Sequence, residues 1–203
     1  MTRQFNLNFS QNSTMQLSNA LSDAVLMTVC LFVFFRYFAR VPFYNKLLWG
    51  IFLITVTLTA AAGVFRFMGI TELRHIHSTL GLLAGTTGLA AAAAGIYGIA
   101  LEQTLSRFTL IGVVTIGLVL FVLLLNPSYR AFEQVVASFT MLLAMVIAVF
   151  GLLRKNMKVL WVVIGVMILG LATKVVSNQV PLNPTDVYHY ALAAMVVCFG
   201  KAV

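Results

Sequence analysis

Seven long apolar stretches divide this chain, and they restrict its fold more than any motif does. Six of them contain no charged residue: 47–65, 78–101, 108–129, 134–153, 159–173 and 187–200. The hydrocarbon core of a bilayer is about 30 Å thick and needs about 20 predominantly apolar residues per helix. Because lipid offers no water to bond the backbone, each such stretch must be helical. The sequence therefore predicts an all-α integral membrane protein with several spans.

The composition agrees with a membrane protein. Hydrophobic residues make up 61% of the chain and charged residues 9%, against about 25% charged residues in soluble domains. The net charge of +8 does not indicate nucleic-acid binding, because no Lys/Arg cluster alternates with aromatic residues. We expect the lipid bilayer as the main partner, in a multi-pass cell-membrane location, or an internal membrane in a eukaryote.

We expect seven transmembrane helices, which follow a polar N-terminal tail over 1–17. Short connections indicate one domain over 18–203. The first span has only twelve uncharged residues, between Asp23 and Arg36, so at least one of these charges must lie near an interface. The expected spans are 18–38, 47–68, 74–101, 106–126, 131–153, 158–177 and 185–203.

Basic residues predict the orientation, because cytoplasmic connections carry an excess of Lys and Arg. Eight lie on the side of the first, third and fifth connections and the C-terminus, and five lie on the other side. This difference places the N-terminus outside and the C-terminus in the cytoplasm. The eight are Arg36, Arg40, Lys46, Arg107, Arg154, Lys155, Lys158 and Lys201. The five are Arg3, Arg66, Arg74, Arg130 and Lys174.

The third expected span has small residues along one face, at a rotation of about 100° per residue. Small residues allow close helix contact in membranes, so we expect this face to pack against a neighbour. His77 extends the face, whereas His75 lies about 160° away and is expected to point elsewhere. The small residues are Gly81, Gly85, Gly88, Ala92 and Gly95.

Ionisable residues gather at the outer ends of three expected spans. Asp23 begins the first, His77 the third, and Asp186 and His189 the last, while Arg66 flanks the second connection. Such residues are costly in lipid and tend to face a bundle interior or a wet cavity. If these helices pack together, their polar ends form an outer-face pocket for a small molecule or lipid headgroup. The competing interpretation is that they lie among headgroups, with Asp186 capping its helix.

The same residues also suggest a metal hypothesis. Zinc takes imidazole nitrogens and carboxylate oxygens, and a catalytic zinc keeps one position open for water. His77, His189 and Asp186 are the candidate ligands, with Asp23 as an alternative carboxylate. A metal-bound water has its pKa lowered to about 7 and becomes a nucleophile at neutral pH.

Seven helices with Ser22-Asp23 in the first and Asp186-Val187-Tyr188-His189 in the last resemble the seven-helix membrane hydrolases, the alkaline ceramidases and adiponectin receptors. The resemblance implies zinc and hydrolysis of a lipid amide or ester. His189 matches the second histidine of that family's last-helix pair, and Thr185 stands at the first. No catalytic residue is assigned. A third hypothesis is a non-catalytic membrane subunit that contacts a partner through the second or fourth span.

Overall fold

The computed structural model describes residues 2–177 and 183–203, with side chains over 15–174 and 183–203. This part of the chain is helical with short connections and has no strand. The α-helices are α1 Thr2–Arg36, α2 Phe43–Phe67, α3 Leu73–Leu83, α4 Leu89–Ala100, α5 Arg107–Leu125, α6 Glu133–Leu153, α7 Leu160–Ser177 and α8 Pro184–Lys201. A π-helical turn, η2 (Ala84–Gly88), joins α3 and α4 into one rod.

Six helical segments are long and apolar enough to cross a membrane, by length and composition. They are Met15–Arg40, Phe43–Phe67, Leu73–Ala100, Arg107–Leu125, Pro127–Leu153 and Met157–Lys174. They correspond to the first six expected spans. The last expected span is the 18-residue α8, which does not meet the same criteria.

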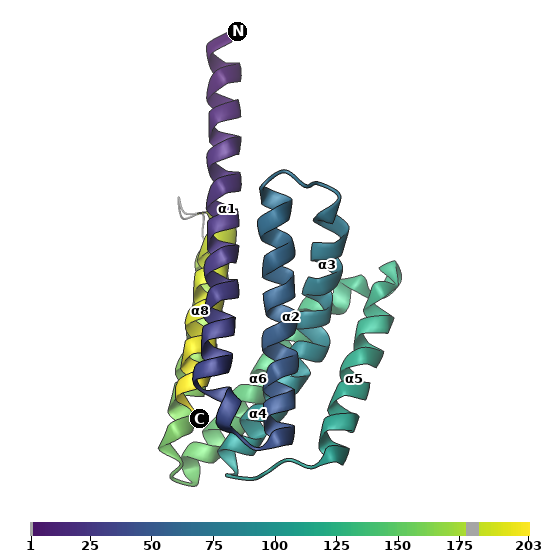
Figure 1. Cartoon of the computed structure of the whole chain (residues 1–203), viewed down its shortest axis with the longest axis vertical. Coiled ribbons are helices and arrows are strands. Elements are labelled where there is room, and N and C mark those ends of the chain that lie inside the picture. The colour runs from purple at the N-terminus through teal and green to yellow at the C-terminus, as the bar shows by residue number, and fades with distance from the viewer. Residues whose placement is uncertain (1, 178–182) are drawn as a thin grey trace.

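The helices form a bundle in which distant parts of the chain lie together (Figure 1). α8 runs alongside α1 and packs against α7, while α6 contacts both α4 and α7. The predicted tail 1–17 is helical from Thr2 and extends α1 beyond the bundle. We call the end formed by 36–46, 101–107 and 154–159 the basic end, and the opposite end, formed by 66–78, 126–133 and 183–189, the histidine end.

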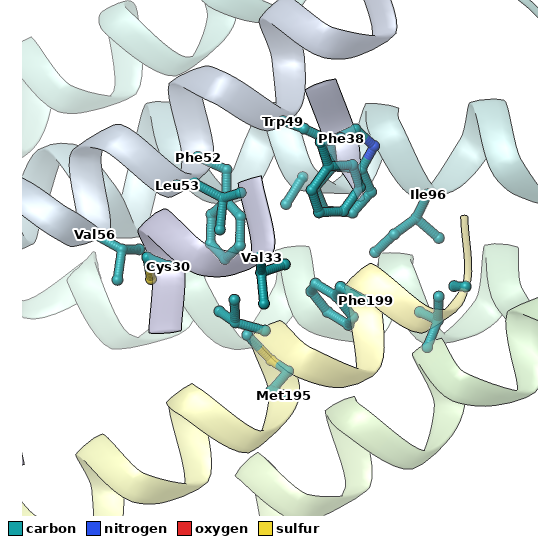
Figure 2. Close-up of a cluster of buried hydrophobic side chains, with 14 of the residues drawn as sticks. Cys30, Val33, Phe38, Trp49, Phe52, Leu53, Val56, Ile96, Met195 and Phe199 are labelled. Carbon is teal, nitrogen blue, oxygen red and sulfur yellow. The ribbon is translucent and has the colours of Figure 1, made fainter. Parts of the chain in front are cut away.

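The largest buried side chains lie in the half of the bundle nearer the basic end. Figure 2 shows a cluster of them. Trp49 of α2 stacks on Phe38 with ring centroids 4.4 Å apart, and Phe199 of α8 meets the Trp49 ring edge-on at 5.8 Å. All three rings are at most 1% exposed. A Cβ on Gly95 would lie 2.6 Å from the Trp49 ring, so only glycine lets α4 approach α2 this closely. In this half of the bundle, the helices are therefore in direct van der Waals contact.

The small-residue face of the third span is packed along only part of its length. Gly88 lies against α2, where a Cβ would be 2.5 Å from Thr55 Oγ1, and Gly95 lies against Trp49. Gly85 has open space instead, and Gly81 meets only a Thr59 methyl group at 3.7 Å. The prediction that the whole face packs is therefore wrong at Gly85, whereas Gly81 is in van der Waals contact with α2. The reason is η2, because a π turn changes the rotation per residue and shifts the face.

Candidate functional site

A cavity of about 1060 Å³ occupies the half of the bundle nearer the histidine end. Its walls come from α1, α2, α3, η2, α4, η3 (Pro127–Phe132), α6, α7 and α8, whereas no described residue of α5 lines it. The open space beside Gly85 is part of this cavity. The bundle is therefore hollow between α3 on one side and α6 and α7 on the other.

The cavity changes from polar to apolar along its length. Along the long helices that line it, the charged residues and the histidines come nearer the histidine end and the large apolar residues come deeper. The polar set is Asp23, Thr59, His77, Arg130, Glu133, Gln134, Ser138, Thr173 and His189. The apolar set includes Leu26, Phe52, Val56, Leu89, Met141, Met145, Val166 and Leu192. The arrangement suits an amphipathic molecule better than a wholly polar one.

His189 of α8 is held by two side chains of α1. Its Nδ1 lies 3.2 Å from Asp23 Oδ1 and 3.2 Å from Ser22 Oγ. Ser22 donates its own hydrogen to the carbonyl of Asn19 at 3.0 Å, and an ionised carboxylate can only accept. Nδ1 of His189 is therefore the donor to this pair. In a neutral ring, Nε2 then carries a lone pair and no hydrogen.

His77 of α3 is fixed in the same tautomer by a different partner. Its Nδ1 lies 2.9 Å from the backbone carbonyl oxygen of Thr59 on α2. A carbonyl only accepts, so Nδ1 carries the hydrogen and Nε2 of the neutral ring carries a lone pair. Among the described residues, no hydrogen bond involves Nε2 of His77 or of His189.

Asp23 is 1% exposed and packs into a space that a glycine provides. A Cβ on Gly63 of α2 would overlap Asp23 Oδ2 and lie 2.7 Å from Asp23 Cγ. Oδ1 faces His189, whereas Oδ2 is buried and has no hydrogen-bond partner among the described residues. Arg66, near the end of α2, is within electrostatic range of Asp23. The site thus holds a buried carboxylate with one oxygen unused.

Polar contacts between α1 and α8 continue beyond the cavity toward the histidine end. Asn183 Nδ2 donates to Asn19 Oδ1 at 2.6 Å, and the Ser18 hydroxyl donates to Asp186 Oδ2. With the His189 contacts, these bonds join the two helices over more than one turn. We call Ser18, Asn19, Ser22 and Asp23 of α1 with Asn183, Asp186 and His189 of α8 the polar seam.

The structure brings together three of the five predicted site residues. Asp23, His77 and His189 all line the cavity. Asp186 and Arg66 are not among its described lining residues: Asp186 is bonded to Ser18, and the Arg66 guanidinium lies over the Phe67 ring, 4.9 Å from its centroid.

His75 is exposed and is also not among the described lining residues. Sequence reasoning missed the α6 contribution, Glu133, Gln134 and Ser138. It also did not identify Ser18, Asn19 and Asn183 of the polar seam. The one available signal for the seam was the spacing of polar residues three and four apart on α1.

The residues do not form a metal site as they stand. Over the described residues, no three His, Cys, Asp or Glu side chains lie close enough to hold one ion. The three predicted ligands, His77, His189 and Asp186, do not converge on one position. Asp186 is bonded to Ser18, and the Nδ1 of His189 faces Asp23. The potential ligand atoms left without a described partner are the two imidazole Nε2 atoms, Asp23 Oδ2 and Asp186 Oδ1.

The chain belongs to the family of unknown function DUF6962, whose model matches residues 18–203. No curated protein and no solved structure matches the chain.

Proposed function

We propose that the protein spans the membrane seven times, with α8 as the seventh span. α8 packs between α1 and α7, so it shares the depth of two helices that qualify as spans. The residues that lower its hydropathy, Asp186 and His189, have partners on α1. Each of the two therefore has at least one partner within the bundle, where intramembrane polar groups are normally found.

The distribution of basic residues supports an orientation with the N-terminus outside. Eight Lys and Arg residues lie on the side of the basic end, which the positive-inside rule assigns to the cytoplasm. The histidine end then faces outward. In intact cells, an impermeant reagent is expected to label a tag at the N-terminus and not one at the C-terminus. The reverse pattern would place the cavity's polar end at the cytoplasmic face.

Within this topology, the protein binds an amphipathic small molecule or lipid in the cavity. The carrying observation is the polarity gradient: Asp23, His77 and His189 lie at one end and an apolar floor lies at the other. Ligand cavities of about 300–1,000 Å³ typically combine apolar walls with a few placed polar groups. This cavity has that size and composition, and its polar groups converge on one end.

One side of the cavity reaches the surface of the bundle. Gln134, Ser138 and Leu142 of α6 line the cavity and are also exposed, as are Gly170 and Thr173 of α7. These residues lie on the two helices that flank this side. In a membrane this side faces lipid, so a ligand enters with its apolar chain from the bilayer.

The proposal is tested by filling the cavity at a position where a side chain disturbs nothing else. Gly85→Phe places a ring in open space within the cavity. Gly112→Phe is the matched control, because Gly112 of α5 also has open space and is not a described lining residue. Binding is measured by equilibrium dialysis of labelled dodecyl amphiphiles against nanodiscs with and without protein.

We expect at least one of dodecanol, dodecylamine, dodecanoate and dodecyl phosphate to bind saturably, at about one per chain. The Gly85→Phe variant loses this binding and the Gly112→Phe variant keeps it. Equal binding by both variants, or no saturable binding to the unaltered protein, would refute the cavity as a ligand site.

A zinc-dependent hydrolase of a lipid amide or ester is the second candidate. The observation in its favour is that both cavity histidines present an unused Nε2, with Nδ1 held by a carboxylate or a carbonyl, as in many metal sites. A third ligand would have to move into place. About one zinc per chain in the purified protein, lost in His189→Ala, would favour this candidate over simple binding.

The non-catalytic subunit hypothesis narrows to one helix. α2 has eleven buried residues and contributes to the core, so it offers less free surface than α5. α5 has only Gly117 and Leu124 buried. A structural subunit would therefore use α5, and a partner would copurify in mild detergent.

A further inference from the structure

The hydrogen bonds at the polar end of the cavity fix which atoms remain for a ligand. The one N–H of neutral His77 is used by the Thr59 carbonyl, and that of His189 by Asp23 and Ser22. What each ring offers to a ligand is Nε2, an acceptor. Asp23 Oδ2, buried and without a described partner, is a third acceptor.

The cationic donor at this end already has partners. Arg130 is the one Lys or Arg among the described lining residues, and it donates to Ser78 Oγ at 2.6 Å. Its Nε also lies 3.7 Å from Glu133, which balances its charge. The lining residues therefore carry two carboxylates, Asp23 and Glu133, against one guanidinium, and the positive charge of Arg66 acts on Asp23 from outside the lining. An anionic head group would meet lone pairs and carboxylates here.

We infer that the ligand's polar end is a hydrogen-bond donor, an ammonium or a hydroxyl group, and not a phosphate or carboxylate. This inference rests on the proposed function and names the ligand class of the same cavity. A donor placed between His77 Nε2 and His189 Nε2 satisfies lone pairs that otherwise have no described partner. Buried acceptors without a donor are costly, so head groups that lack one are rejected.

The first experiment compares head groups on one chain and needs no variant. Dialysis is run in phosphatidylcholine nanodiscs, because that headgroup has no donor to compete. Dodecylamine and dodecanol are expected to bind, and dodecanoate and dodecyl phosphate to bind at least about tenfold more weakly. Dodecyltrimethylammonium carries a positive charge without an N–H donor. We expect it to bind about tenfold more weakly than dodecylamine. This result would show that hydrogen-bond donation, and not positive charge alone, determines binding.

The second experiment changes one carboxylate at a time. Asp23→Asn removes the charge beside His189 and is expected to weaken dodecylamine binding about tenfold, since hydrogen bonds to a charged group are the stronger ones. Dodecanol should change by about threefold or less. Asp186→Asn is the matched control, with the same substitution in the polar seam at a residue that is not a described lining residue. Because the Asp186 charge also acts on Asp23 and His189 from outside the cavity, this variant should weaken dodecylamine binding by about threefold or less and leave dodecanol binding unchanged.

The outcomes separate the two proposals. Dodecanoate or dodecyl phosphate binding as tightly as dodecylamine overturns the donor inference and leaves the cavity proposal intact. Equal losses in Asp23→Asn and Asp186→Asn also overturn the inference, because they would reflect the helix contact. If no dodecyl compound binds the unaltered protein, the proposed function fails and the inference fails with it.

Discussion

The two halves of this bundle contain the same kinds of residue, but these residues close the packing in one half and border open space in the other. Near the basic end, glycines bring helices into contact: Gly95 lies against Trp49, and Gly200 lies against Tyr37, where a Cβ would be 2.7 Å from the ring. Near the histidine end, Gly85 and Gly170 have no atom within 4 Å of an added Cβ. A glycine in a membrane helix therefore does not by itself indicate a packed interface. Its neighbours decide whether the space is closed or left for a ligand.

Polar residues differ between the halves in the same way. Near the basic end, Asn45 bonds the connection after α4, accepting from the Leu105 backbone at 2.9 Å and donating to the Gln103 carbonyl at 3.3 Å. These bonds close a structural contact. Near the histidine end, Asp23 keeps one oxygen without a described partner. The Asn45 side chain uses both its oxygen and its nitrogen within the fold, whereas Asp23 keeps an oxygen that a ligand can bind.

The largest expected effect comes from placing the same large residue in both halves. Gly95→Leu forces α4 away from Trp49 and should remove most of the folded protein, because overpacking a closed core costs about 1–3 kcal/mol or more. Gly85→Leu enters the cavity and should retain near-normal yield. Yield and melting temperature are measured by size-exclusion chromatography after graded heating. Similar losses at both positions would mean that the cavity half is as closed as the core.

A smaller effect is expected at Gly63, where the hollow half is locally packed. Gly63→Ala pushes the Asp23 carboxylate away from His189 and should cost about 1–3 kcal/mol. Asp23→Ala removes the clash, so adding it to Gly63→Ala should cost less than the sum of the two single changes. The measurement is a double-mutant cycle of unfolding free energies. Additive losses would show that Gly63 does not act through Asp23.

The smallest expected effect is a gain. Gly170→Ala on α7 adds a methyl group in open space and replaces glycine in a helix, which should stabilise the protein by up to about 1 kcal/mol. Gly95→Ala, the matched change in the closed half, should destabilise it. Thermal melts of the two variants, run side by side, check the sign. A loss at Gly170 would indicate an atom packed against α7 at that point.

The helices themselves were predictable from the sequence, because uncharged stretches of about 20 residues have few alternatives. Five of the expected spans, such as 158–177 for α7 (Leu160–Ser177), agree with helices of the structure within two residues at both ends. Asp23, His77 and His189 were found as candidates because ionisable residues in a span are rare. Their location on the cavity wall follows from helix packing, which the sequence does not contain.

Other features were beyond sequence reasoning for identifiable causes. The open space at Gly85 depends on the π turn of η2, which interrupts the regular rotation used to assign faces. Ser18, Asn19 and Asn183 are neutral and common, so nothing marked them as partners. The α6 residues Glu133 and Gln134 enter the site only because α6 lies across the cavity from α3.

The polar seam also has a consequence for biosynthesis. The partners of Asp186 and His189 lie on α1, which leaves the ribosome long before α8 does. Until the two helices meet, α8 presents unpaired polar groups, and it is less apolar than the six segments that qualify as spans. If α8 is the seventh span that we propose, its entry into the membrane is coupled to docking on α1. The assembled bundle is closed by its first and last helices, and a nascent chain that lacks α8 leaves the seam residues of α1 unpaired.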